Sequence, residues 1–264
     1  MELLTADGLA ALSTGTVALL LLAAFVAGWV DAVVGGGGLV QLPALLLVPG
    51  ISPVQALATN KVAGLMGTSV SAATFYRRVQ PDLRTAGPMA LAALAGGGAG
   101  AGLAAWLPGE VIEPIVLVAL LAVAAWTIAR PRLGRATELR WTGRRHLVAA
   151  AALGAGIGFY DGLVGPGTGT FLVIGLVGLL GYAFLQATAQ AKIINALTNL
   201  GALVVFALQG APLWALGGLM GVANIGGAYL GARMAVARGS GFVRVVFLVV
   251  VGGLVATFAW DVLS

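Results

Sequence analysis

The chain has 264 residues, of which 60% are hydrophobic and only 9% are charged, with 41 glycines, no cysteine and a net charge of +5. A soluble domain is about 25% charged, and the 14 basic and 9 acidic residues of this chain could not cover a soluble surface of this size. The composition therefore excludes a soluble enzyme, a nucleic-acid-binding protein and a secreted disulfide scaffold, and it predicts an integral membrane protein.

Long apolar stretches predict membrane-spanning helices, because a helix needs about 20 apolar residues to cross the hydrocarbon core. In chain order they cover residues 16–34, 54–76, 85–106, 111–129, 147–164, 185–208, 213–236 and 242–260. Two shorter apolar pieces, 39–48 and 169–184, each follow a glycine-rich break, and they are expected to be either short crossings or re-entrant hairpins. The sequence thus predicts an all-α polytopic membrane protein with glycine-broken helices.

Basic residues predict the orientation in the membrane, because cytoplasmic loops carry an excess of lysine and arginine. Arginines crowd residues 77–84, 130–146 and 238–244, so these segments are expected in the cytoplasm. The acidic N-terminus and the acidic turn at 108–113 are expected outside the cell. Counting crossings between these points favours about five segments in each half of the chain. Topology therefore explains the net positive charge, and no nucleic-acid partner is expected.

The single histidine, His146, lies in an arginine-rich stretch and is expected to be an exposed loop residue. A Ser–His protease would need this histidine in the membrane core, and a histidine metal site would need further ligands. The sequence therefore predicts no catalytic residue, no metal and no cofactor.

The two halves of the chain resemble each other at a spacing of about 130 residues. The corresponding segments are 28–31 with 158–161, 35–38 with 165–168, and 58–61 with 189–192. We therefore divide the chain into a first transmembrane repeat (1–129), a basic cytoplasmic linker (130–146) and a second transmembrane repeat (147–264). An odd number of segments per repeat turns the second repeat upside down. Inverted-topology repeats with broken helices are typical of secondary transporters, which bind substrate at the repeat interface.

Four charged residues lie within apolar sequence and form two repeat-related pairs, Asp31 with Asp161 and Lys61 with Lys192. The lysines stand out because the chain contains no others. A charge at bilayer depth costs at least about 2.5–3.5 kcal/mol and normally faces the protein interior or a wet cavity. We expect the lysines to bind an anionic substrate and the aspartates to balance their charge or carry protons. The alternative is two structural Asp–Lys pairs that only fix geometry.

Glycine breaks beside the two aspartates would let backbone N–H groups approach a ligand, and helices that begin there would point their N-termini toward an anion. Amide and hydroxyl side chains near the lysines extend this site. The candidate substrate-binding residues are Lys61, Lys192, Asn60, Asn195, Asn199, Thr168, Gly36, Gly37 and Gly167, with Asp31 and Asp161 for coupling or charge balance. The glycines at 96–98 and 226–227 are instead expected to permit close helix packing.

The motif Gly28-x-x-Asp31 with four glycines and Leu39, followed by Thr59-Asn60-Lys61, resembles the first half of the TauE/SafE family of sulfite exporters. The motif Gly158-Phe159-Tyr160-Asp161-Gly162 with Gly165-Pro166-Gly167-Thr168, followed by Lys192, Asn195 and Asn199, resembles its second half. The resemblance implies an inner-membrane permease for small sulfur-containing anions such as sulfite or organosulfonates, often acting as an exporter. Gln190-Ala191 stand where the first half has Thr59-Asn60, so the two lysines have different surroundings.

We therefore expect a secondary transporter in the cell inner membrane that works by alternating access, with an external N-terminus and the 130–146 linker in the cytoplasm. Its expected partners are a small anion and the lipid bilayer, and a homodimer is left open. The alternatives are an intramembrane enzyme acting on a lipid phosphate, an anion channel and a non-transporting scaffold. Enzymatic chemistry would need clustered carboxylates, a nucleophile with a base, or a metal site. The sequence offers none of these, so we do not expect an enzyme.

Overall fold

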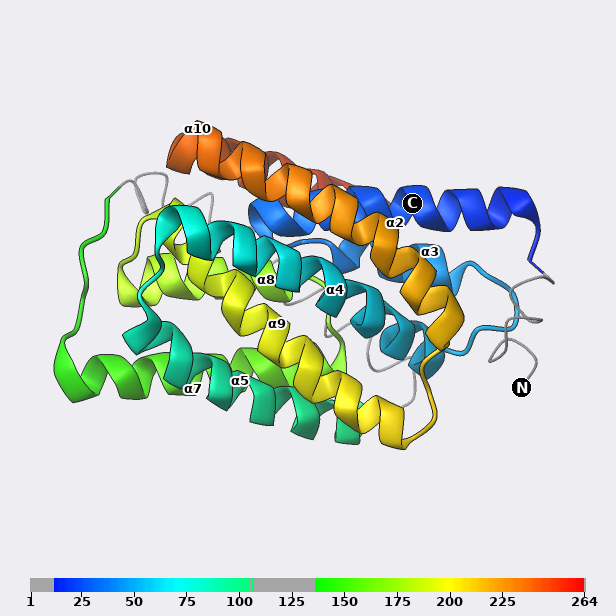
Figure 1. The fold of residues 1–264 in the computed structure, drawn as a ribbon, viewed down its shortest axis with the longest axis horizontal. Coiled ribbons are helices and arrows are strands. Elements are labelled where there is room, and N and C mark those ends of the chain that lie inside the picture. The colour runs from blue at the N-terminus through cyan, green and yellow to red at the C-terminus, as the bar shows by residue number, and fades with distance from the viewer. Residues whose placement is uncertain (1–11, 105, 107–135, 264) are drawn as a thin grey trace.

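The computed structural model describes residues 12–104, 106 and 136–263, and the regular structure in these residues is helical (Figure 1). The elements are α2 (Thr14–Val34), α3 (Gly38–Leu46), α4 (Pro53–Val79), α5 (Leu83–Ala104), α7 (Gly143–Leu163), α8 (Thr168–Ile174), the π-helical η2 (Gly175–Leu180), α9 (Phe184–Leu208) and α10 (Trp214–Leu263). Five helices are long and apolar enough to cross a membrane: α2, α5, α7, α9 and the part of α10 at Trp214–Val243. The prediction of an all-α polytopic protein is confirmed, and the predicted span 111–129 lies outside the described residues.

The first predicted glycine break separates α2 from α3. Helix α2 ends where Gly35 adopts a φ of 88°, a left-handed conformation that favours glycine. Helix α3 has nine residues, so its length of about 14 Å is less than half of the hydrocarbon core. A Cβ atom on Gly37 would lie 2.6 Å from the backbone oxygen of Ala27. The chain therefore turns back on itself, and α3 begins beside the last turns of α2.

The second break follows the same pattern. Helix α7 ends at Leu163, and α8 with η2 returns the chain along α7. A Cβ atom on Gly175 would lie 2.5 Å from the side chain of Leu153. After η2, the backbone oxygen of Gly181 accepts a hydrogen bond of 2.8 Å from the N–H of Glu138, which precedes α7. The short segment thus brings the chain back to the end of the bundle where α7 begins.

The arginine-rich segments meet at this same end. The Nε2 group of Gln186, at the start of α9, donates to the backbone oxygen of Val79 at the end of α4 over 3.3 Å. The N–H of Leu185 donates to the hydroxyl of Ser240 over 3.2 Å. Ser240 follows Gly239, whose non-helical φ of 72° divides α10. The described parts of the three arginine-rich segments therefore lie together at one end of the bundle.

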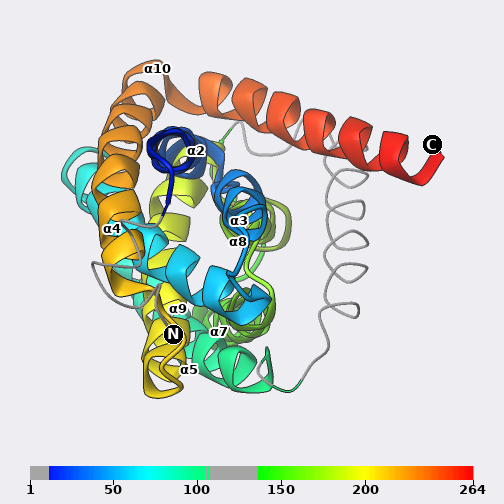
Figure 2. The same cartoon turned by 90° about the vertical axis from the view of Figure 1, so that its right-hand side faces the viewer.

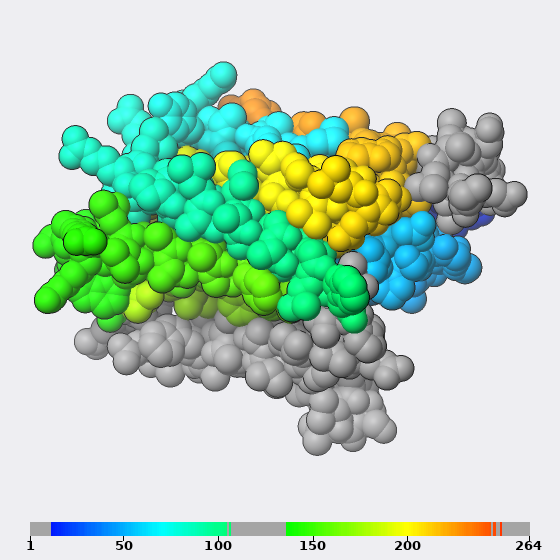
Figure 3. Space-filling model, turned by 90° about the horizontal axis from the view of Figure 1, so that it is seen from below, coloured from blue at the N-terminus to red at the C-terminus, as the bar shows by residue number. Residues whose placement is uncertain are grey.

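Close approach between the long helices depends on glycine. A Cβ atom on Gly96 of α5 would overlap the backbone oxygen of Ala155 of α7, and one on Gly227 of α10 would overlap the backbone oxygen of Phe25 of α2. The predicted packing role is confirmed at Gly96 and Gly227, whereas a Cβ atom on Gly226 would meet only the ring of Phe25 at 3.4 Å. The contacts of Gly96 and Gly227 both join the two halves of the chain, because α5 packs along α7 and α10 along α2. Figure 3 shows α5 and α7 side by side on one face of the molecule.

The outward-facing surface of the helices is rich in apolar side chains, and a group of polar and charged side chains is buried among the apolar cores. Large apolar side chains such as Leu19 (68% exposed), Leu91 (68%) and Val222 (64%) face outward, while both lysines are buried. Exposing this much apolar surface to water would be unfavourable, whereas contact with the hydrocarbon core of a bilayer is favourable. Seen end-on in Figure 2, α3 and α8 lie next to each other, beside α2. Helix α8 is largely buried, whereas α3 buries Gln41, Leu42 and Leu45 and leaves Pro43 and Leu46 exposed.

Candidate functional site

The two glycine breaks, one from each half of the chain, touch each other. The backbone N–H of Thr170 donates to the oxygen of Gly35 over 3.2 Å, and its hydroxyl donates to the oxygen of Val34 over 3.1 Å. A Cβ atom on Gly35 would overlap the backbone of Gly169. Only glycine therefore fits at this crossing of the two chain segments, and the starts of α3 and α8 are held together.

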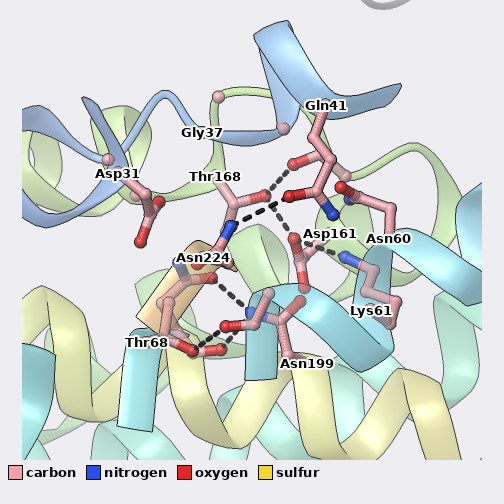
Figure 4. Close-up of a pocket in the computed structure, with 17 residues that line it drawn as sticks. Asp31, Gly37, Gln41, Asn60, Lys61, Thr68, Asp161, Thr168, Asn199 and Asn224 are labelled. Carbon is pink, nitrogen blue, oxygen red and sulfur yellow. Dashed lines mark hydrogen bonds and ion pairs between the residues drawn. The ribbon is translucent and has the colours of Figure 1, made fainter. Parts of the chain in front are cut away.

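A polar cavity of about 30 Å³ lies beside the crossing (Figure 4), enough for about two water molecules. It is lined by residues of α2, α3, α4, α7, α8, α9 and α10, and thus by both halves. The predicted residues that line it are Lys61, Asn60, Asn195, Asn199, Thr168, Gly37 and Gly167, together with Asp31 and Asp161. Among the described residues, Lys192 and Gly36 belong to the predicted set but do not line this cavity.

The four membrane charges form two ion pairs that cross between the halves. The Nζ atom of Lys61 lies 2.8 Å from Oδ1 of Asp161, and that of Lys192 lies 3.0 Å from Oδ2 of Asp31. The lysine side chains are 1% and 0% exposed, and the Asp161 and Asp31 side chains are 2% and 14% exposed. The hydroxyl of Thr168 also donates to Oδ1 of Asp161 over 2.5 Å. Each lysine thus neutralises the aspartate of the other half.

The two lysines have different positions relative to the cavity. Lys192 donates to both the carboxylate and the backbone oxygen of Asp31, but it does not itself line the cavity. Lys61 lines the cavity, and its Nζ lies 3.0 Å from where a Cβ atom on Gly165 would stand. The absence of a side chain at Gly165 therefore leaves room for the ammonium group. Lys61 is the lysine placed to meet a ligand, whereas Lys192 is placed to hold Asp31.

The lining residues that are missing from the predicted set include two amide side chains, Gln41 and Asn224. They are 1% and 4% exposed, and Nδ2 of Asn224 donates to Oε1 of Gln41 over 2.9 Å. A comparison of the repeats could not reveal them, because phenylalanine and leucine stand at the corresponding positions about 130 residues away. The signal that could have found them is an uncharged amide within an apolar stretch.

Two buried polar atoms of the lining have no hydrogen-bond partner in the described part of the chain. They are Nε2 of Gln41, a donor, and Oδ2 of Asp161, an acceptor. Buried polar groups in proteins are nearly always satisfied, so both atoms are available to a ligand or to water in the cavity. The cavity therefore presents a cation, an amide donor and a carboxylate oxygen.

A second polar cluster lies at the arginine-rich end, and it corrects the prediction for His146. This residue lies in the first turn of α7 and is only 6% exposed, so the expectation of an exposed loop histidine is wrong. Its Nε2 lies 3.0 Å from the hydroxyl of Thr85 and 3.3 Å from that of Tyr182. Chain segments distant in sequence cover the ring, and the local arginine-rich sequence gives no sign of them.

Asp82 completes this cluster. The hydroxyl of Tyr182 donates to its Oδ2 over 2.8 Å, as does that of Thr85. Partial burial opposes ionisation of Asp82, but these hydrogen bonds and one from the N–H of Arg84 lower its pKa below the ordinary value. Burial raises the pKa of Tyr182 to about 12. Within residues 12–104, 106 and 136–263, no three His, Cys, Asp or Glu side chains gather closely enough to hold a metal ion.

Comparisons with known proteins show the family to which the chain belongs. A sequence profile of the family described as "Sulfite exporter TauE/SafE" matches residues 20–258. The chain is 41% identical to "Probable membrane transporter protein ORF9" of Sinorhizobium sp over 234 residues, which is 88% of each chain. It is 33% identical to "Probable membrane transporter protein YfcA" of Escherichia coli K12, over 90% of this chain and 87% of the relative.

A third relative, a "Probable membrane transporter protein" of Haemophilus influenzae, is 32% identical over 92% of this chain and 94% of its own. No solved structure matches the chain. The family profile covers both glycine breaks, all four membrane charges and the amides of the cavity. The chain therefore belongs to the TauE/SafE family and is a multi-pass membrane transporter.

Proposed function

We propose that the protein is a secondary transporter that exports small sulfur-containing anions, such as sulfite or organosulfonates, and binds them in the cavity beside the two glycine breaks. The observation that carries this proposal is Lys61, a buried lysine that lines a polar cavity between the halves. A buried charge in a membrane protein normally marks a substrate or ion pathway.

The donors around the cavity suit an oxygen-bearing anion. The ammonium group of Lys61 has three N–H donors, and Asp161 occupies one of them. Gln41 supplies an unpartnered amide donor, and Asn60 adds a second amide. The four membrane charges sum to zero, so a bound anion introduces a net negative charge. Uptake of a proton by Asp161 or Asp31 would neutralise it, which gives the aspartates their role in charge balance.

The size of the cavity favours the smallest substrates. A space for about two water molecules must widen slightly to admit the four heavy atoms of sulfite. Organosulfonates carry an additional carbon chain and require a larger displacement of α3 and α8. Sulfite should therefore bind more tightly than sulfoacetate.

Alternating access would follow from two inverted-topology repeats, residues 1–129 and 147–264, rocking against each other. The crossed packing supports this arrangement, because α2 packs along α10 and its repeat counterpart α7 packs along α5. The crossed ion pairs and the touching breaks lie where such a motion would separate the halves. The common end of the arginine-rich segments supports an inner-membrane orientation with the 130–146 linker in the cytoplasm and the N-terminus outside.

Counterflow in proteoliposomes tests the proposal, with radiolabelled sulfite outside and unlabelled sulfite inside. We expect the native protein to accumulate label, and Lys61→Ala and Lys192→Ala each to lose this flux. Arg78→Ala is the control, since it removes the same charge from an exposed position, and it should retain flux. Full transport by both lysine variants would reject the site. A channel would conduct without counterflow, and a lipid phosphatase would release phosphate.

A further inference from the structure

We propose that Gln41 is a specificity-determining residue whose amide N–H group binds the substrate anion, and that Asn224 is a positioning residue that fixes the orientation of this amide. The inference rests on the proposed anion site and deepens it. It identifies the substrate as an anion that presents an oxygen acceptor toward α3, in addition to the oxygen that Lys61 binds.

The orientation of Asn224 is set by two glycines. A Cβ atom on Gly67 would overlap Oδ1 of Asn224, and one on Gly28 would lie 2.9 Å from the same atom. The amide oxygen therefore faces the Cα–H groups of these glycines, which are weak donors. The reversed amide would direct N–H hydrogens against Cα–H hydrogens. Since hydrogen-bond surroundings decide which end of an amide carries the nitrogen, Nδ2 of Asn224 must point away from the glycines, toward Gln41.

Asn224 in turn fixes Gln41. Its Nδ2 donates to Oε1 of Gln41 over 2.9 Å, so the amide oxygen of Gln41 is engaged and its nitrogen faces the other way. That nitrogen is buried and has no partner among the described residues. Gln41 lines the cavity beside Lys61 and Asn60 (Figure 4). Leaving a buried donor unpaired is unfavourable, and an anion in the cavity supplies the missing acceptor.

The cavity wall at Gln41 thus presents an N–H donor. Its orientation is fixed by the contacts of Gly28 and Gly67 with Asn224, and of Asn224 with Gln41. If the amide of Gln41 turned over, the same wall would present an oxygen and repel an anion. The second half has no equivalent of this wall, because phenylalanine stands at position 171. The donor of Gln41 therefore has no counterpart at the matching position of the second half.

Titration calorimetry of sodium sulfite against the purified protein tests this inference. Gln41→Met removes the donor at similar length, and the loss of one hydrogen bond to a charged group predicts a Kd raised about ten- to a hundredfold. Asn224→Asp leaves only acceptors beside Gln41, so the glutamine should turn to donate to the carboxylate and present its oxygen to the cavity. Asn195→Asp is the charge-matched control. It adds the same charge to the cavity lining, and its oxygen can still accept from Thr198 and Asn199.

A double-mutant cycle separates positioning from charge. Asn224→Asp should weaken binding more than Asn195→Asp does, and this excess should disappear in the Gln41→Met background. Equal effects of the two aspartates in both backgrounds would overturn the role of Asn224. A Gln41→Met variant that binds sulfite as the native protein does would overturn the role of Gln41. If Gln41→Met does not fold, Gln41→Glu replaces the donor within the same shape and should weaken binding at least as much, because it also adds a negative charge beside the anion.

The native protein separates failure of this inference from failure of the proposed function. If it binds neither sulfite nor sulfoacetate, both the proposed anion site and the proposed role of Gln41 are rejected. If it binds sulfite and the variants of Gln41 are unaffected, only the inference is rejected.

Discussion

Variants of the ion pair between Lys61 and Asp161 can distinguish the role of Lys61 in protein stability from its role in transport. Lys61→Met removes the ammonium group 2.8 Å from a carboxylate that is 2% exposed. Breaking a buried pair by removing one partner costs about 3–5 kcal/mol, a factor of about a hundred to several thousand in the folding equilibrium at about 1.4 kcal/mol per tenfold. Adding Asp161→Asn removes the unpaired charge, while the amide oxygen can still accept from Thr168. Most of the lost stability should return.

Transport should not return with it, because the cavity has lost its cation. Equilibrium unfolding in detergent measures stability, and sulfite counterflow measures transport. The parallel change at the other pair, Lys192→Met, should cost less stability, since Asp31 is 14% exposed and is partly solvated. A Lys61→Met/Asp161→Asn protein that is both stable and fully active would refute the reasoning, because Lys61 would then serve structure alone. If Lys61→Met is as stable as the native protein, the buried ion pair does not stabilise the fold.

Three further predictions follow from other parts of the molecule. Gly227→Ala should lower stability by about 1–3 kcal/mol through overlap with the backbone of α2, whereas Gly226→Ala meets only an aromatic ring edge at 3.4 Å and should be nearly neutral; equal unfolding midpoints would contradict this. Because hydrogen bonds lower the pKa of Asp82 from 3.8, the unfolded chain takes up a proton first as the pH falls. The stabilisation that ionised Asp82 gives the folded protein is therefore complete above pH 3.8, and it is lost as the pH falls through the lower pKa that Asp82 has in the folded state. Between pH 7 and pH 3, the melting temperature of Asp82→Asn should therefore fall less than that of the native protein. The same fall in melting temperature for both proteins would contradict this prediction. Since the chain has no cysteine, Arg140→Cys should react with an impermeant maleimide only from the cytoplasmic side and Gln209→Cys only from outside, and the reverse pattern would invert the topology.

The fold could be predicted where hydropathy and glycine decide local structure. The predicted stretches 16–34 and 185–208 coincide closely with α2 and α9, because long apolar runs have few other stable forms in a membrane. The breaks at 35–38 and 165–168 were also predictable, since clustered glycines end helices. The direction of the short segments after the breaks depends on contacts with α2 and α7, which local sequence does not encode.

The site could be predicted only in part. The charges of Lys61 and Asp161 were identifiable because charge is rare and costly in apolar sequence. Repeat symmetry shows which residues correspond but not which touch, so the crossed pairing could not be anticipated. Gln41 and Asn224 have no repeat counterparts, and they become visible only when α3 and α10 are brought together. Burial of His146 likewise depends on segments distant in sequence.

Binding of the anion in the cavity is tested most directly by an anomalous-scattering crystal structure of the protein with selenite. In selenite, a strongly scattering selenium atom replaces the sulfur of sulfite. We expect a selenium peak in the cavity beside the two glycine breaks, with oxygen atoms within hydrogen-bond distance of Nζ of Lys61 and Nε2 of Gln41. An empty cavity with selenite bound only along the arginine-rich end of the helices would contradict it.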